Sequence, residues 1–182
     1  MHAFLTDAGD EVLRVEHPID ATFVRAHLID FIVSYGYKHI IRPEVLVAVG
    51  RRAVNLHISL LPWNRGYHPN VWSFLEDTPK GVTIHVIDEG VDTGEILVQD
   101  SVTFGHGETL SSSYALLSER IEQLFRSNWD AIKAGELTSR PQEGEGSCHR
   151  EADLTDYEHV LSNGWNTPVA EIQGMAMRER SS

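Results

Sequence analysis

Short apolar segments that alternate with helical patterns constrain the fold of this chain more than any other feature. The strand-like segments are residues 11–16, 31–35, 53–58, 82–87 and 96–102, and the helical ones are residues 23–30, 43–49 and 69–76. A regular order of strand and helix favours an α/β fold, because each helix can carry the chain back across the sheet. We therefore expect a mostly parallel sheet flanked by helices. Residues 82–87 and 96–102 are the exception, and we expect them to pair as an antiparallel hairpin.

A long amphipathic helix is predicted over residues 109–134, where apolar side chains recur at steps of three and four. Gly135 is suited to end this helix, because glycine readily adopts the left-handed conformation that often closes a helix. We therefore expect residues 1–138 to form the core. Residues 139–150 have the composition of a linker, so residues 139–182 are expected to be a linker and a short C-terminal extension, with a small helix near residues 155–161.

Composition narrows the classes of function. The chain has 182 residues and a formal net charge of −12, which repels polyanions and argues against a nucleic-acid partner. Cys148 is the single cysteine, so no intramolecular disulfide can form and a reducing compartment is favoured. No apolar run approaches the roughly 18 residues of a membrane helix. These features predict a cytoplasmic protein with no membrane partner.

Three polar residues fall where strands of such a sheet end. Asn55 and His57 are two apart on one strand and so share a face, and Asp92 lies in a glycine-flanked turn. Ligands bind at the carboxyl ends of strands in open α/β sheets. An amide can stabilise a developing oxyanion, and an imidazole can transfer a proton near neutral pH. Taken singly, each residue has a commoner structural explanation, such as a satisfied histidine, a turn-closing asparagine or a solvated acidic loop.

The order of motifs between residues 31 and 99 resembles the folate-dependent formyltransferase family, which includes glycinamide ribonucleotide, methionyl-tRNA and nucleotide-amino-sugar formyltransferases. The motifs are Asn55-Leu56-His57-Ile58-Ser59-Leu60-Leu61-Pro62, Arg65-Gly66, Pro69, Trp72, Gly81-Val82-Thr83-Ile84-His85, Asp92-Thr93-Gly94-Glu95-Ile96 and Gln99. Several short motifs in one order are far more specific than any of them alone. The resemblance implies a Rossmann-like formyltransferase fold, 10-formyltetrahydrofolate as the co-substrate, and transfer of its formyl group to an amine.

The resemblance also implies a role for each of the three polar residues. Asn55 matches the family asparagine that orients and polarises the formyl oxygen. His57 matches the histidine that stabilises the tetrahedral intermediate and helps to move its proton. Asp92 matches the aspartate that sets the protonation state of the histidine and helps, through water, to deprotonate the attacking amine.

Binding residues follow from the same resemblance. Those expected to bind folate lie in two segments, and they are Tyr35, Gly36, Tyr37, His39, Ile40, Ile41, Asp88, Glu89, Gly90 and Val91. Those expected near the amine substrate are Trp63, Arg65, Gly66 and Tyr67. His57, His68 and His85 could cluster, but no spacing matches a recognised zinc motif, so no metal is expected.

The start of the chain departs from the family pattern. Residues 1–9 resemble the end of the first family helix, so we expect the first strand and its glycine-bearing loop to be missing. A missing strand would leave an open sheet edge, at which we expect a homodimer contact or disorder. Without that loop, glycinamide ribonucleotide is a poor acceptor, and the acidic charge and short tail disfavour methionyl-tRNA. The tail at residues 146–154 resembles those of short formyltransferases of amino-sugar pathways.

The expected acceptor is therefore a primary amine on a nucleotide-linked amino sugar, with an amino acid or peptide amine as the next alternative. Two further functions stay open, namely hydrolysis of formyltetrahydrofolate and non-catalytic folate binding. Family hydrolases carry an additional N-terminal regulatory domain, which we do not expect here. The presence of Asn55, His57 and Asp92 argues against a non-catalytic role.

Overall fold

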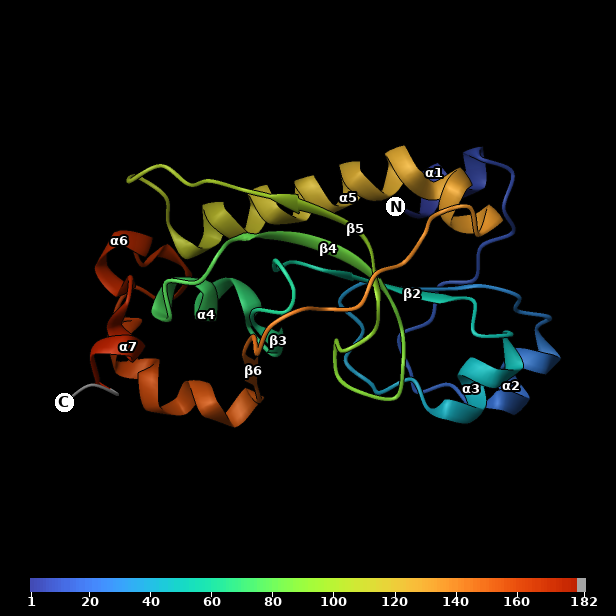
Figure 1. The fold of residues 1–182 in the computed structure, drawn as a ribbon, viewed down its shortest axis with the longest axis horizontal. Helices are drawn as coiled ribbons and strands as arrows, with labels where there is room; N and C mark the ends of the chain where they lie inside the picture. The colour runs from blue at the N-terminus through green and yellow to red at the C-terminus, as the bar shows by residue number, and fades with distance from the viewer. Residues whose placement is uncertain (180–182) are drawn as a thin grey trace.

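A four-stranded sheet forms the centre of the protein, which Figure 1 shows as a computed structural model that describes residues 1–179. The strand order is β1-β2-β4-β5. The strands are β1 (Ile32–Ser34), β2 (Ala53–His57), β4 (Gly81–Val86) and β5 (Ile96–Ser101). The expected α/β arrangement of a sheet flanked by helices is confirmed, as is the antiparallel pairing of β4 with β5.

The expectation of a mostly parallel sheet is wrong, because β1 and β2 are the one parallel pair among the described strands of this sheet. At the carboxyl end of β2, His57 lies opposite Thr83, near the start of β4. Helix α4 (Pro69–Leu75) lies between these strands in sequence and has seven residues. It spans about 10 Å, whereas β2 extends about 17 Å. The chain therefore stays at the carboxyl end of β2 and re-enters the sheet there, in the opposite direction.

The strand predicted at residues 11–16 is also wrong, because this segment is an extended loop. Leu13 is 49% exposed, and Arg14 and Glu16 pair with each other on the surface at 2.6 Å. A β-prone composition forms a strand only where a neighbouring strand supplies hydrogen bonds, and within the described residues none pairs with this segment.

Helix α5 (Leu110–Ala134) covers one face of the sheet (Figure 1), where the largest cluster of buried side chains lies. Its N-cap Thr109 and Ser112 bond reciprocally, and Gly135 ends the helix at φ 70°, as expected. The helix packs its apolar stripe on β2 and β4. The buried members of this cluster are Leu5, Val54, Leu56, Val82, Ile84, Leu117, Ile121, Phe125, Trp129 and Ile132.

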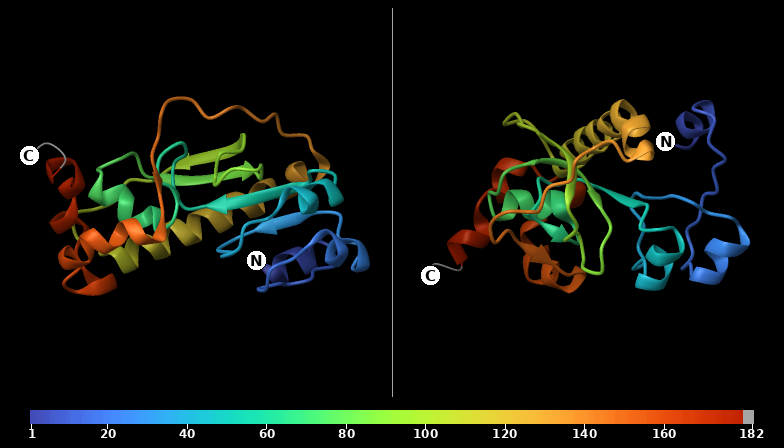
Figure 2. Two further views of the ribbon diagram at one scale, coloured as in Figure 1. Left: turned by 90° about the horizontal axis from the view of Figure 1, so that it is seen from below. Right: turned by 45° about the vertical axis from the view of Figure 1, so that its right-hand side comes forward.

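Two smaller clusters of buried side chains belong to helices that lie at opposite ends of the molecule in Figure 2. Near β1, α2 (Ala21–Ala26) packs on α3 (Pro43–Ala48) around Val24, Val45 and Leu46. At the other end, the C-terminal elements pack on α4 or, in the case of η2, on α5. These are η1 (Glu151–Val160), η2 (Gly164–Asn166), α6 (Val169–Ile172) and α7 (Met175–Glu179). The N-terminal helix α1 (His2–Asp7) lies on α5, with Phe4 edge-on to Phe125 at 6.4 Å.

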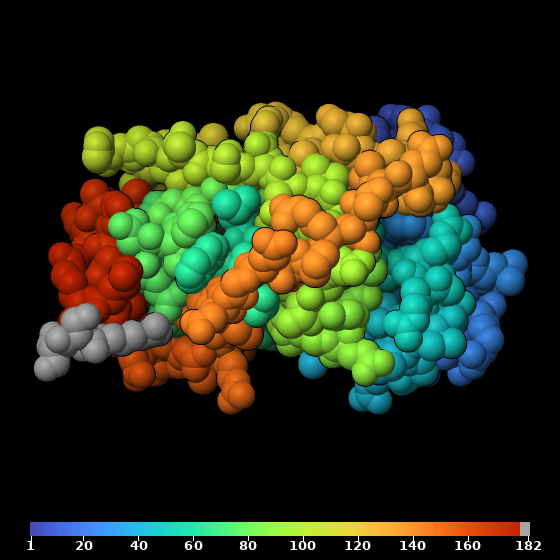
Figure 3. All heavy atoms as spheres, in the orientation of Figure 1, coloured from blue at the N-terminus to red at the C-terminus, as the bar shows by residue number. Residues whose placement is uncertain are grey.

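Residues 139–149, which we term the strap, cross one face of the molecule between α5 and η1 (Figure 3). At one end, Arg140 and Ile96 exchange both backbone hydrogen bonds. At the other end, β6 (Cys148–His149) pairs in parallel with β3 (Arg65–Gly66). The strap therefore joins the start of β5 to β3, which lies in the segment that follows β2. Among the described residues, no helix combines the length and apolar character that crossing a bilayer requires.

Replacement of Ile121 by alanine tests the α5 packing. Ile121 is fully buried against the sheet, so Ile121→Ala should lower the free energy of unfolding by about 2–5 kcal/mol. Glu119→Ala, at an exposed position on the same helix, is the matched control and should change it by about 0.5 kcal/mol or less. Urea unfolding measures both variants. Equal stability of the two would contradict the described orientation of α5.

Candidate active site

The site begins with the alternation of side chains along β2. Val54 and Leu56 face α5 and join its core, so Asn55 and His57 point to the opposite face, as the sequence predicts. Asn55 is half-buried, whereas His57 is only 6% exposed. An amide and an imidazole therefore lie side by side on the face that α5 leaves uncovered.

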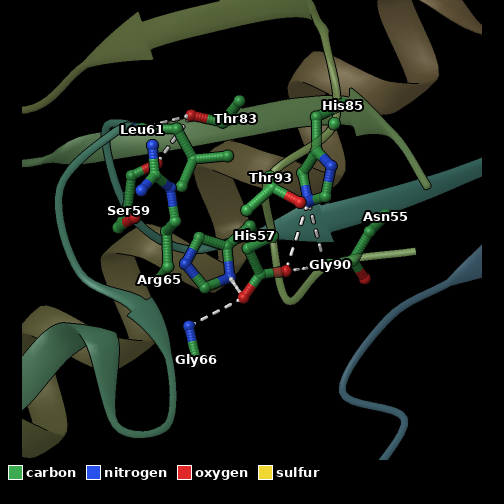
Figure 4. A network of polar contacts seen from close by, with 12 residues as sticks. Asn55, His57, Ser59, Leu61, Arg65, Gly66, Thr83, His85, Gly90 and Thr93 are labelled. Carbon is green, nitrogen blue, oxygen red and sulfur yellow. Dashed lines mark hydrogen bonds and ion pairs between the residues drawn. The ribbon is translucent and has the colours of Figure 1, made fainter. Parts of the chain in front are cut away.

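Figure 4 shows Asn55, His57, Gly66 and His85 converging on one unlabelled carboxylate. Their contacts identify it as the carboxylate of Asp92, which lies at the centre of this face. Its Oδ1 accepts a hydrogen bond from Asn55 Nδ2 at 2.9 Å and lies 3.3 Å from His85 Nε2. Its Oδ2 accepts from the Gly66 N–H at 2.8 Å and lies 3.5 Å from His57 Nδ1. One side chain thus links β2, β3 and β4.

Asp92 itself has a left-handed backbone, with φ 53°. Aspartate tolerates this conformation better than most residues, but it still costs free energy. The loop around it is shaped by Asp88, whose carboxylate accepts from the Gly90 N–H at 3.0 Å and from Thr93 Oγ1 at 2.7 Å. Gly94 packs so closely that an added Cβ would lie 1.8 Å from the Val86 carbonyl oxygen. The loop can therefore aim Asp92 back toward β2.

Backbone carbonyls fix the hydrogen positions on both histidine rings. His57 Nε2 lies 2.9 Å from the Asn64 carbonyl oxygen, and His85 Nδ1 lies 2.8 Å from that of Val86. A carbonyl can only accept, so each of these nitrogens carries a hydrogen. In a neutral ring, the nitrogen that faces Asp92 is then unprotonated. A proton arriving at His57 Nδ1 would therefore form an ion pair with Asp92.

The surroundings favour the neutral form of His57 and the charged form of Asp92. Burial lowers the pKa of His57, although Asp92 works against that shift, so the neutral ring is favoured near pH 7. Burial alone would raise the pKa of Asp92. A positive charge on His57, the contact with His85 and the Gly66 N–H outweigh burial and hold the pKa of Asp92 far below its usual range. When His57 is neutral, the Gly66 N–H and the Asn55 amide still donate to the carboxylate and favour its ionised form. The site therefore holds an ionised carboxylate beside a neutral imidazole.

A second hydrogen-bond network holds the loop between β2 and β3. Thr83 Oγ1 donates to the Ser59 carbonyl at 2.7 Å and accepts from the Leu61 N–H at 3.1 Å. Gln99 Nε2 donates to the Leu61 carbonyl at 2.8 Å. Asn64 is fully buried and donates through Nδ2 to Thr78 at 2.8 Å. These bonds place the Asn64 carbonyl and the Gly66 N–H against the two catalytic candidates His57 and Asp92.

The residues expected to bind the amine substrate follow this loop. Gly66 contacts Asp92 directly, and Arg65 Nε donates to Gln142 Oε1 of the strap at 2.9 Å. The Trp63 carbonyl accepts from Ser59 Oγ at 2.6 Å, and Tyr67 is 43% exposed. Arg65 and Gly66 are therefore part of the polar framework around Asp92.

The first segment expected to bind folate follows β1, whose last residue, Ser34, lies opposite Asn55. Tyr37 Oη donates to the His17 carbonyl at 2.8 Å, and Ile41 is buried with α2 and α3. Tyr35 packs against the α5 core. Gly36, His39 and Ile40 are exposed. The side chains of Tyr35, Tyr37 and Ile41 thus hold the segment in place, and its backbone remains as the expected ligand-binding feature.

The second segment, residues 88–91, forms the first half of the Asp92 loop. Asp88 is committed to loop hydrogen bonds, and Glu89, Gly90 and Val91 are exposed. Sequence reasoning did not assign a site role to His85, Asn64 or Gln142. His85 carried a signal, because it is two residues after Thr83 on a strand next to β2. Gln142 carried none, since its contacts depend on the path of the strap.

A cleft of about 470 Å³ opens beside this centre, between α4, β6 and η1. His149 stacks on Trp72 at 3.8 Å between ring centroids, and its Nε2 lies 3.1 Å from Glu76 Oε2. None of Asn55, His57 and Asp92 lines the cleft, but its residue His149 pairs with Gly66. Within residues 1–179, no three His, Cys, Asp or Glu side chains are grouped to hold a metal ion.

Comparison with known proteins places this geometry in a family. The family model described as formyl transferase matches residues 14–127, a span that includes Asn55, His57 and Asp92. The chain belongs to the formyl transferase family. The chain spans about half the length of the curated relatives it matches, and the matches cover 74% and 82% of the chain.

Two relatives illustrate the similarity. The formyltransferase PseJ from Anoxybacillus kamchatkensis, solved with UDP-4,6-dideoxy-4-formamido-L-AltNAc and tetrahydrofolate, is 46% identical with a TM-score of 0.92. The match covers 96% of this chain and 93% of PseJ. The dTDP-4-amino-4,6-dideoxyglucose formyltransferase of Mycobacterium tuberculosis is 33% identical over 134 residues, which are 74% of this chain and 56% of the relative.

The lowered pKa of His57 predicts a pH-dependent stability. Above about pH 6.5 the ring is neutral in both the folded and the unfolded chain. Below that pH the unfolded chain binds the proton first, so the free energy of unfolding falls by at most about 1.4 kcal/mol per pH unit from this group. His57→Gln removes this contribution. Urea unfolding at about pH 7.5 and 5.5 should show the stability difference shifting in favour of the variant at the lower pH. A difference independent of pH would contradict the assignment.

Proposed function

We propose that this protein transfers a formyl group from 10-formyltetrahydrofolate to the primary amine of a nucleotide-linked amino sugar. The observation that carries the proposal is the convergence of Asn55 and His57 on the Asp92 carboxylate, at the face of the sheet that α5 leaves open. Formyl transfer to an amine needs a proton acceptor for the nitrogen and hydrogen-bond donors for the oxygen of the intermediate. The same three residues can supply both.

The choice of acceptor is supported by similarity. PseJ is matched over nearly its whole length, and its crystal structure holds a UDP-linked formamido sugar together with tetrahydrofolate. A sugar N-formyltransferase from Shewanella, 25% identical with a TM-score of 0.73, matches 93% of the chain. An amino-sugar acceptor is therefore better supported than an amino acid or a peptide amine.

In the proposed reaction, His57 carries the proton. The amine nitrogen attacks the formyl carbon, and the proton it loses passes to neutral His57 at Nδ1, directly or through water. The imidazolium so formed lies 3.5 Å from Asp92 Oδ2, which stabilises it. The proton then moves to the leaving folate nitrogen as the bond from the formyl carbon to that nitrogen breaks. Because its pKa is held so low, Asp92 acts through its charge and is a poor proton acceptor itself.

Asn55 supplies the amide group of the proposed site. Its Nδ2 points toward Asp92 and lies 3.3 Å from His85 Nε2. To donate to the formyl oxygen, the amide exchanges the longer of these contacts for the substrate. A half-buried donor stabilises an oxyanion more than an exposed one would, because the surroundings are less polar than water.

The remaining parts of the proposal concern the binding segments, the cellular compartment and the partners of the protein. We propose that folate lies along residues 35–41 and 88–91, and that the sugar substrate lies near residues 63–67. We also propose that the protein acts in the cytoplasm, without nucleic acid, membrane or metal. A homodimer contact is proposed at β1, an edge strand of the described sheet.

A direct assay tests the function. The protein is incubated with 10-formyltetrahydrofolate and a UDP-linked 4-amino sugar, and mass spectrometry detects the formamido product. Formate release without amine measures hydrolysis, and a panel of amino acids and peptides measures the alternative acceptors. Formate release at the same rate with and without the sugar, and no formamido product, would refute the proposal.

Asp92→Asn tests the mechanism. The change keeps the size of the side chain but removes its charge, so the imidazolium loses its partner. We expect kcat/KM to fall roughly 100- to 10,000-fold, while binding of a folate analogue is retained. Asp130→Asn, at an exposed site on α5, is the chemically matched control and should be unchanged. Near-wild-type turnover of Asp92→Asn would exclude the proposed role.

A further inference from the structure

The strap places one amide between the Asp92 loop and β3. Gln142 Nε2 donates to the carbonyl oxygens of Asp92 at 2.8 Å and Gly94 at 2.9 Å. Its Oε1 accepts from Arg65 Nε at 2.9 Å. Both N–H groups are thus directed at carbonyls and the oxygen at a guanidinium, so the chemistry of the three partners fixes the orientation of the amide.

Asp92 is therefore held by hydrogen bonds at two different groups. Gly66 and Asn55 donate to its carboxylate, and Gln142 donates to its backbone carbonyl. Its left-handed backbone, at φ 53°, persists only where surrounding contacts over-determine it. The bond from Gln142 reaches that backbone from a segment fifty residues away in sequence.

Contacts on both sides of Gln142 anchor the strap to the rest of the protein. The backbone bridge from Arg140 to Ile96 lies two residues before it, and the Ser147 N–H donates to the Pro62 carbonyl at 3.2 Å. Gly146 packs so closely on Pro62 that an added Cβ would lie 2.1 Å from its carbonyl oxygen. With both ends of the strap anchored, the amide has little freedom to move away from its three partners.

We propose that Gln142 is a positioning residue for formyl transfer, which holds the backbone of Asp92 so that its carboxylate faces His57. The inference rests on the proposed function. Gln142 has no contact with the carboxylate of Asp92 or with His57 among the described contacts, so it acts through the loop. Small misplacement of a catalytic group costs rate more than it costs binding.

Two variants separate this role from simple anchoring of Arg65. Gln142→Met keeps the length of the side chain and loses all three hydrogen bonds. Gln142→Glu still offers Arg65 an acceptor, which is now a charged carboxylate. The same carboxylate cannot donate to the carbonyl oxygens of Asp92 and Gly94, so those two hydrogen bonds are lost. If Gln142 positions Asp92, both variants lose about 100-fold in kcat while KM for the folate co-substrate stays near wild type.

Ser139→Ala is the matched control on the strap. Ser139 donates to Glu95 and has no described contact with Asp92, so its loss should leave kcat and KM unchanged. Near-wild-type kcat in Gln142→Glu would overturn the inference, because anchoring of Arg65 would then suffice. An equal loss of kcat in Ser139→Ala would also overturn it, because the effect would then belong to the strap as a whole.

A measurement without substrate distinguishes failure of this inference from failure of the proposed function. The groups that face the His57 ring are Asp92, His85 and the Asn64 carbonyl. If Asp92 turns away in Gln142→Met, the ring loses its anionic neighbour and should titrate at lower pH by NMR than in wild type. An unchanged titration in that variant would overturn the inference. A shifted titration in a protein that transfers no formyl group would sustain the positioning role and refute the function.

Discussion

The Asp92 carboxylate is the interaction on which the site depends. It lies in a loop between β4 and β5, yet its partners come from β2, β3 and β4. Neutral donors, the Asn55 amide and the Gly66 N–H, hold the charge in a half-buried position. The same arrangement leaves His57 with an unprotonated nitrogen toward an anion. An imidazole so placed is ready to accept a proton, which is what transfer of an acyl group to an amine requires.

Sequence patterns predict the parts of this arrangement that depend on local periodicity. Asn55 and His57 share a face because a strand alternates its side chains, and α5 is long and amphipathic with a glycine at its end. The direction of β4 could not be predicted in this way. Strand direction depends on how far the connecting residues reach, and the short α4 keeps the chain at one end of the sheet. Residues 11–16 have a β-prone composition and still form a loop, because none of the described strands pairs with them.

Contacts over long sequence separations account for the rest. Gln142 reaches Asp92 from beyond α5, fifty residues away, so this contact leaves no periodic signal in the sequence. In the segments expected to bind folate, the resemblance indicates a stretch of chain but not the atoms that would face the ligand. Tyr35, Tyr37 and Ile41 stand in a stretch that resembles the family pocket, but the structure uses their side chains for packing. A resemblance can therefore place a segment near a site without indicating which of its atoms face the ligand.

The central claim is that an ionised Asp92 lies beside a neutral His57 whose hydrogen is fixed on Nε2. The ¹⁵N chemical shifts of the His57 ring, measured at about pH 7.5, report both protonation and tautomer. The account predicts a neutral ring with its hydrogen on Nε2, bonded to the Asn64 carbonyl. A doubly protonated ring at this pH, or a neutral ring with its hydrogen on Nδ1, would contradict it.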